Sequence, residues 1–281
     1  MIYLFQLILL GALLGLGIAC EKETVGTPSI NKEVSLKNSR EGMKPFPGYV
    51  PLEMKMLYAE MADYLKGKDI AMVGPAPNLV GTNMGPEIDT HDVVCRVNNS
   101  FIINEEMIPD YGTKKNILFN SGSELGLQVL EDVWSQWQNF EYIMLPGIHQ
   151  HYGKGHETVL EGIRRVDMNG IPIFQPKQEW FFDWQYKIDK EKKWNFLNTG
   201  LSSIRLLLEF EINSLTVYGF TFYRGGKGYV KYQDEILKKI VSENPTIGYQ
   251  YSSDGAAHQQ HKQRRFFRKY IESDPRVIFI E

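Results

Sequence analysis

The sequence predicts an α/β protein with a Rossmann-like, mostly parallel central sheet and helices on both of its faces. Short apolar runs typical of buried strands alternate along the chain with segments whose apolar residues recur at helical spacing. Parallel strands need long crossover connections, which are usually helices, so this alternation favours a parallel sheet over hairpins. Two of the apolar runs, 70–74 and 93–97, are also followed by glycine or asparagine residues, as strands that border a nucleotide crevice are.

The first helix is expected at Leu52–Lys66, where apolar residues recur at helical spacing and Gly67 follows as a C-terminal stop. Strands are predicted at 70–74, 93–97, 116–120, 141–145, 171–174, 214–218 and 276–280. Further helical patterns lie at about 123–138, 156–168, 200–210, 232–242 and 258–272. No internal repeat or second domain is evident, so residues 52–281 are predicted to form a single domain.

Residues 1–20 are predicted to be a signal anchor or a lipoprotein signal. The run is apolar apart from Gln6 and glycines, and its length suits either a short membrane span or the core of a signal peptide. Ile18-Ala19-Cys20 resembles a bacterial lipoprotein cleavage site, so lipid attachment at Cys20 is the alternative to a membrane-spanning anchor. Residues 21–51 are rich in Lys, Glu, Ser, Asn, Gly and Pro, which predicts a flexible stem. In both interpretations the folded body is exported or tethered to a membrane.

The charge and cysteine composition narrows the classes of partner and of chemistry. The chain has 31 Lys and Arg against 34 Asp and Glu, a net charge of −3, with the two signs mixed along its length. Such a chain has no basic surface field suited to nucleic acid. The two cysteines are Cys20 and Cys95, and with Cys20 in or beside the membrane no structural disulfide is expected. Cys95 falls in an apolar strand pattern and is expected to be a buried, unreactive thiol.

Three segments carry residues suited to holding a phosphate or activating a hydroxyl. The loop Gly74–Asn78 would bring backbone close to a ligand, with Asn78 as a hydrogen-bonding side chain. The segment Asn198–Gly200 would cap a helix and leave N–H donors that attract a phosphate or a carboxylate. His258 would begin another helix, where the helix dipole lowers the imidazole pKa and suits it to act as a neutral base. Taken singly, each segment is also common as an ordinary turn, cap or surface feature.

Taken in order, these segments resemble the sialyltransferases of glycosyltransferase family 29. The long motif of that family is similar to Val73–Asn98, and its continuation is similar to Asp110–Lys114. The short motif is similar to Asn198-Thr199-Gly200, followed by Tyr218-Gly219-Phe220, and the very short motif is similar to His258 with Gln263. The resemblance spans about residues 67–272 and implies the sialyltransferase-like variant of the GT-A fold.

The resemblance implies an inverting glycosyltransferase that moves an acidic sugar, most commonly sialic acid, from a CMP-sugar donor to a glycan hydroxyl. His258 would take the proton from the acceptor hydroxyl, and Tyr229 or Tyr232 would donate to the departing phosphate. The residues implied in binding the donor are Gly74, Asn78, Asn98, Asn198, Thr199 and Gly200. A member of this family would be held in the secretory pathway lumen by a Golgi-like type II anchor, with a bacterial lipoprotein as the alternative.

No cofactor or metal ion is expected. The donor of this family carries one phosphate, and the chain has no Asp-x-Asp triplet of the kind that holds a divalent ion beside a diphosphate. His149, His151 and His156 could ligate a metal, but no carboxylate stands at a supporting spacing.

The chain also departs from the family pattern at several positions. Pro75 stands where the family often has an asparagine, Asn198 replaces a serine, and Gln263 replaces a glutamate. The histidine that precedes two aromatic residues in the family is missing, which leaves Tyr229, Tyr232 or Tyr223 as stand-ins. Two alternatives therefore stay open: a Kdo-type transferase with the same machinery, and a catalytically inactive nucleotide- or glycan-binding protein.

Overall fold

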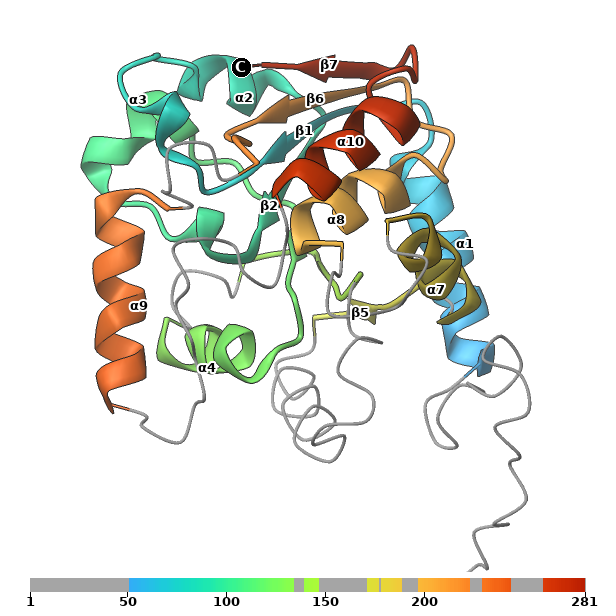
Figure 1. Cartoon of the computed structure of the whole chain (residues 1–281), viewed down its shortest axis with the longest axis horizontal. Helices are drawn as coiled ribbons and strands as arrows, with labels where there is room; N and C mark the ends of the chain where they lie inside the picture. The colour runs from blue at the N-terminus through green and yellow to red at the C-terminus, as the bar shows by residue number, and fades with distance from the viewer. Residues whose placement is uncertain are drawn as a thin grey trace, which may run out of the picture.

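The computed structural model of the chain describes residues 51–133, 139–146, 171–176, 178–188, 197–222, 229–243 and 260–280. These residues form one seven-stranded sheet in the order β5-β4-β3-β2-β1-β6-β7, surrounded by helices (Figure 1). Every pair of neighbouring strands is parallel. The predicted fold class is therefore confirmed, and the described sheet is parallel throughout rather than mostly.

All seven predicted strands are present. They are β1 (Asp69–Val73), β2 (Val93–Val97), β3 (Ile117–Phe119), β4 (Tyr142–Met144), β5 (Ile173–Phe174), β6 (Ser214–Tyr218) and β7 (Val277–Phe279). The predicted runs of β3, β4, β5 and β7 are each longer than the strands that form, whereas those of β1, β2 and β6 match in length.

In addition to the first predicted helix, four of the other predicted helices are present. The longer helices are α1 (Pro51–Leu65), α4 (Glu124–Asp132), α7 (Gln178–Ile188), α8 (Thr199–Leu207), α9 (Lys231–Glu243) and α10 (Gln260–Tyr270). Helix α7 was not predicted, nor were the short α2 (Gly85–Thr90), α3 (Ile108–Tyr111) and the 3₁₀ turns η1 (Pro77–Leu79), η2 (Asn98–Phe101) and η3 (Glu105–Met107). The helix predicted at 156–168 lies outside the described residues.

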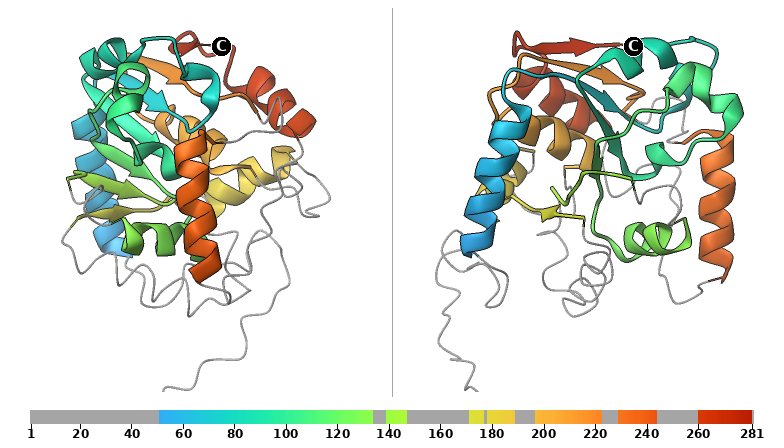
Figure 2. Two further views of the ribbon diagram at one scale, coloured as in Figure 1. Left: turned by 90° about the vertical axis from the view of Figure 1, so that its left-hand side faces the viewer. Right: turned by 180° about the vertical axis from the view of Figure 1, so that it is seen from behind.

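The two faces of the sheet carry different helices, because side chains alternate between the faces along every strand. Ile70 and Met72 of β1 belong to one core cluster, which α1, α7, α8 and α10 also line. Ala71 and Val73 face the opposite way, toward α2 and α3, and that face continues under α4 and α9. In both views of Figure 2, α9 (orange) stands apart from α10 (red). Helices on both faces are thus confirmed.

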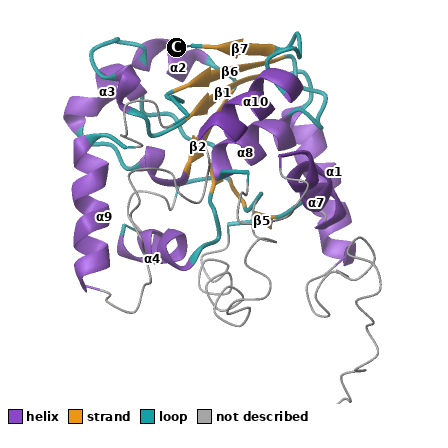
Figure 3. Ribbon diagram, in the orientation of Figure 1, coloured by secondary structure: helices purple, strands orange, loops and turns teal. Residues whose placement is uncertain are grey.

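The strand order reverses between β1 and β6, which are adjacent in the sheet but far apart in the sequence. From β1 the chain proceeds outward through β2, β3, β4 and β5, and from β6 it proceeds in the other direction to β7 (Figure 3). Ligands of open parallel sheets bind at such a switch point, outside the carboxyl ends of the strands. The loops that follow β1 and β6 are therefore the first place to look for a site.

Residues 1–50, which include the predicted anchor and all but the last residue of the predicted stem, lie outside the described residues. Among the helices that the structure does describe, none has the length and apolar composition needed to cross a membrane. Cys95 is a free, fully buried thiol in β2, as its apolar surroundings predicted. Burial raises its pKa well above the ordinary value, which keeps the thiol protonated and unreactive.

Candidate nucleotide-binding site

The loops after β1 and β6 touch through their backbones. The N–H of Gly74 donates to the carbonyl of Tyr218 at 2.8 Å, and the N–H of Ala76 donates to that of Gly219 at 3.1 Å. A Cβ atom on Gly74 would collide with the Gly219 carbonyl oxygen, so only glycine allows this approach. The glycine of the long motif thus serves first to bring the two strand ends together.

Phe220 joins this pair of loops to the start of α8. A Cβ atom on Gly74 would lie 2.8 Å from the Phe220 ring, and one on Gly200 would collide with the opposite edge of the same ring. The ring therefore fills the space that two absent side chains leave. The sequence suggested that Gly200 holds a phosphate; the structure shows that its missing side chain makes room for Phe220. The three glycine-containing motif segments interlock around one aromatic ring.

The start of α8 is held by side chains from two other helices. The Asn198 side chain caps α8 by accepting from the Leu201 N–H at 2.8 Å. The N–H of Asn198 donates to Oε1 of Gln263 on α10 at 3.2 Å, and the N–H of Leu197 donates to Oε1 of Gln185 on α7 at 3.0 Å. Both glutamines are buried. The short and very short motifs are thus connected directly through Gln263, which the sequence showed only as a departure from the family pattern.

Two N–H groups at the start of α8 remain available for a ligand. Among the residues that the structure describes, no acceptor is within hydrogen-bonding distance of the N–H of Thr199 or Gly200. First-turn N–H groups of a helix have no partner within it and attract anions. Thr199 is largely buried. The role of this segment in holding a phosphate or carboxylate stays a prediction.

Asn98 lies at the end of β2 and links it to the end of β3. Its Oδ1 accepts from the N–H of Ser121 at 3.1 Å, and its φ of 48° places it in the left-handed region that asparagine tolerates. Ser100, fully buried, donates to the carbonyl of Val73 at 2.7 Å and so ties the end of β2 to β1. Because Oδ1 is occupied, the Asn98 amide N–H₂ is the group left to donate to a ligand.

Asn78 lies in η1, in a loop to which Asp110 and Tyr111, from the continuation of the long motif, form hydrogen bonds. The Tyr111 hydroxyl donates to the Ala76 carbonyl at 2.8 Å, and the Asp110 carboxylate accepts from the N–H groups of Gly81 and Asn83 at 2.7 and 2.8 Å. Oδ1 of Asn78 is buried and has no hydrogen-bond partner among the described residues. A buried polar atom without a partner is costly, which marks Asn78 as a residue whose surroundings are incomplete without a ligand.

Two charged residues of the long motif, Asp89 and Arg96, hold the local structure together. The Asp89 carboxylate accepts from the N–H groups of Thr113 and Lys114 at 2.8–3.0 Å. Arg96 is fully buried and donates to the carbonyls of Tyr111 and Lys114 at 2.8–3.1 Å. Burial lowers the pKa of Arg96 to about 10, which still leaves it charged near neutrality. Together these two side chains hold the turn that positions Asp110 and Tyr111.

Tyr229 and Tyr232 lie on the other face of the sheet from α8. Both pack against the apolar cluster that includes Leu237 and Ile240 of α9. Burial raises the pKa of Tyr229 to about 12, so its hydroxyl stays protonated and able to donate near neutral pH. Their role as donors to a departing phosphate stays a prediction.

The remaining predicted residues fall in undescribed parts of the chain. His258 lies outside the described residues, two positions before Gln260 begins α10. His149, His151, His156 and Tyr223 also lie outside them. Within the described residues, no three His, Cys, Asp or Glu side chains are grouped so that they could hold a metal ion.

The comparison with family models agrees with the motifs. The family model described as glycosyltransferase family 29 (sialyltransferase) matches residues 22–152, which include β1, β2, β3 and the long motif. The resemblance to this family is therefore confirmed over this part of the chain. Among solved structures, the chain is similar to the crystal structure of a mammalian sialyltransferase, with 17% sequence identity and a TM-score of 0.35. That match covers 63% of this chain and 66% of the other, just under two thirds of its length. No curated protein matches.

Proposed function

We propose that this chain is a sialyltransferase-like glycosyltransferase, which moves an acidic sugar from a CMP-sugar donor to a hydroxyl of an acceptor glycan. One observation carries the proposal: the ends of β1, β2 and β6 meet the start of α8 at the strand-order reversal, in a chain whose long motif matches family 29. Sialic acid is the first donor to test. Kdo is the second, because it is also a CMP-activated acidic sugar that the same machinery would accept.

In this proposal the residues at the strand ends bind the nucleotide. The Asn98 amide donates to the ribose or phosphate of CMP, and Asn78 completes its hydrogen bonding on the same ligand. The N–H groups of Thr199 and Gly200 at the start of α8 hold the phosphate or the donor carboxylate, aided by the helix dipole. Asn198 supports them by capping the helix, and Gly74 keeps the β1 and β6 loops in contact.

The chemical step would be a single displacement with inversion at the anomeric carbon. His258 takes the proton of the acceptor hydroxyl as it attacks, while the bond to the CMP phosphate breaks and a phenol, Tyr229 or Tyr232, donates to the departing oxygen. Positioning of the two substrates and stabilisation of the phosphate charge would supply most of the rate. No metal ion takes part in this proposal, because these N–H and O–H donors can stabilise the charge of a single phosphate by hydrogen bonding.

The change of glutamate to Gln263 does not by itself argue for an inactive protein. The contact that the structure shows uses Oε1 as an acceptor for the Asn198 N–H, and an amide oxygen fills that role as a carboxylate would. Gln263 is also fully buried, where a neutral group avoids the cost of burying a charge. We further propose that residues 1–20 tether the enzyme to a membrane.

A donor panel tests the function. Full-length protein is incubated with CMP-sialic acid, CMP-Kdo and a set of glycan acceptors in buffer containing EDTA, and released CMP is measured. We expect acceptor-dependent CMP release from one of the two donors, undiminished by EDTA. CMP binding without release from either donor would instead favour the inactive binding protein, and loss of turnover in EDTA would point to a metal-dependent reaction.

Asn98→Ala should weaken CMP binding by about 1–3 kcal/mol, the cost of removing one partner of a buried hydrogen bond. Alanine is strained at a φ of 48°, so Asn98→Gly is the matched variant, which removes the amide without that strain. Isothermal titration with CMP should show a similar loss for both variants. An unchanged dissociation constant in both would place the nucleotide elsewhere.

A further inference from the structure

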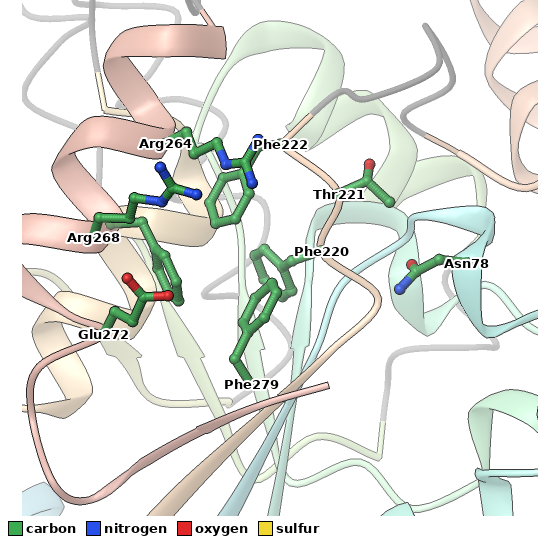
Figure 4. Close-up of a pocket in the computed structure, with 9 residues that line it drawn as sticks. Asn78, Phe220, Thr221, Phe222, Arg264, Arg268, Glu272 and Phe279 are labelled. Carbon is green, nitrogen blue, oxygen red and sulfur yellow. The ribbon is translucent and has the colours of Figure 1, made fainter. Parts of the chain in front are cut away.

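A pocket of about 320 Å³ lies between α10 and the loops that follow β1 and β6 (Figure 4). Its inner wall is a cluster of three phenylalanines, Phe222, Phe267 and Phe279, with ring centroids 4.9–5.8 Å apart. Figure 4 shows Arg264 and Arg268 reaching over this cluster from α10, with Asn78 and Thr221 across the pocket from them. An apolar wall with a few convergent polar groups is the usual composition of a ligand site.

The two arginines of the pocket have no ion-pair partner in the part of the chain that the structure describes. Arg264 and Arg268 lie one turn apart on α10, and within the described residues neither forms an ion pair. Arg205 and Arg276, in contrast, pair with Glu209 and Asp274. Two unpaired guanidinium groups one turn apart form a fork that suits a carboxylate or phosphate. The pocket is therefore equipped for a ligand that has both an anionic group and an apolar face.

The pocket is separate from most of the predicted donor site. Asn78 is the only predicted donor residue that lines it. Phe220 also lines it, and the same ring fills the space between Gly74 and Gly200. The ring thus stands between the pocket and the start of α8. A CMP-sugar held by Asn78, Asn98 and the start of α8 would reach this pocket only at Asn78, and would leave its arginines and phenylalanines free for the second substrate.

We propose that this pocket binds an acidic sugar of the acceptor glycan. The sugar's carboxylate or phosphate lies on Arg264 and Arg268, and its apolar ring face packs on the phenylalanines. Glu272, exposed in the turn that follows α10, accepts from the sugar hydroxyls. The volume is near the lower end for ligand pockets, which fits one sugar ring rather than a longer chain. The assignment depends on the chain being the transferase proposed above, and it predicts that the acceptor is anionic close to the accepting hydroxyl.

The test uses saturation-transfer NMR on the full-length protein with three sugars. N-acetylneuraminic acid supplies a carboxylate, glucose 6-phosphate supplies a phosphate, and galactose is the neutral control. We expect signals from one or both acidic sugars and none from galactose, with roughly a tenfold or greater loss of affinity in Arg264→Gln/Arg268→Gln. A carboxylate-only or phosphate-only response identifies the anionic group.

The matched control is Arg265→Gln/Lys269→Gln, which removes the same charge from exposed positions of the same helix that do not line the pocket. It should bind the acidic sugars like the wild type. Equal loss in both double variants would overturn the proposal in favour of a diffuse basic surface. Displacement of the sugar by CMP would assign the pocket to the donor instead, and binding of anionic phospholipid vesicles with no sugar signal would assign it to a membrane.

The failure of this proposal can be told apart from the failure of the function. Arg264→Gln/Arg268→Gln should keep the wild-type CMP dissociation constant and the slow CMP release from donor alone, while its KM for an acidic acceptor rises and kcat changes little. If the wild type neither binds CMP nor releases it from any donor, the function itself is wrong, whatever the sugars show.

Discussion

Replacement of His258 by alanine should lower turnover by about 10²–10⁴-fold and leave CMP affinity nearly unchanged. The expected loss is that of a general base, which acts on the acceptor hydroxyl and not on the nucleotide. Gln263 ties α10 to the start of α8 through the Asn198 N–H. Helix α10, which begins two residues after His258 in the sequence, is thereby tied to the helix proposed to hold the phosphate.

His261→Ala is the matched control for this variant. His261 is exposed in the first turn of α10, so its loss should change neither kcat nor CMP binding. The pH profile separates the roles further, because removal of the base should abolish the acidic limb of kcat, whereas a purely structural change would lower the whole curve. A fully active His258→Ala enzyme would exclude this histidine as the base.

The strands could be predicted because they are short, mostly apolar runs bounded by polar or glycine-rich turns. The inner strands are buried on both faces by helices, whereas β7, at the edge of the sheet, is partly exposed. Helix α7 could not be predicted, because its apolar residues are mostly large aromatics that also occur in loops, interrupted by charges at irregular spacing. The short α2 and α3 span six and four residues, too few to show a helical period. These segments are held by distant partners such as Asp89 and Arg96, which local pattern does not reveal.

The candidate site was predictable in its location but not in its construction. The structure brings Gly74 and Asn98, at strand ends, and Gly200, at the start of α8, to the same end of the sheet, as their motif order led us to expect. Their role in binding a nucleotide stays a prediction. The contact of Phe220 with Gly74 and Gly200 depends on β1 and β6 being neighbours in the sheet, which the sequence alone leaves open. The role of Gln263 was missed for the same reason, since its partner is 65 residues away.

Gly200→Ala should destabilise the fold by about 1–3 kcal/mol and weaken CMP binding with it. The new Cβ atom would collide with one edge of the Phe220 ring and lie 3.1 Å from its Cζ. The ring cannot retreat, because its other edge already lies against Gly74. The φ of Gly200 is not in the left-handed range, so the backbone itself accepts alanine and the whole cost arises from the ring. Urea unfolding and CMP titration measure the two effects.

The partner variant Phe220→Ala reverses the sign of this effect. With the ring removed, alanine at position 200 meets no obstacle, and alanine in a helix is favoured over glycine by about 1 kcal/mol. Gly200→Ala should therefore be neutral or stabilising in the Phe220→Ala background, although Phe220→Ala alone is destabilising. A double-mutant cycle should give a coupling free energy of about 1–3 kcal/mol between the two positions. Additive effects would mean that the glycine of the short motif is needed for the ligand and not for the ring, and the interlocked arrangement would lose its basis.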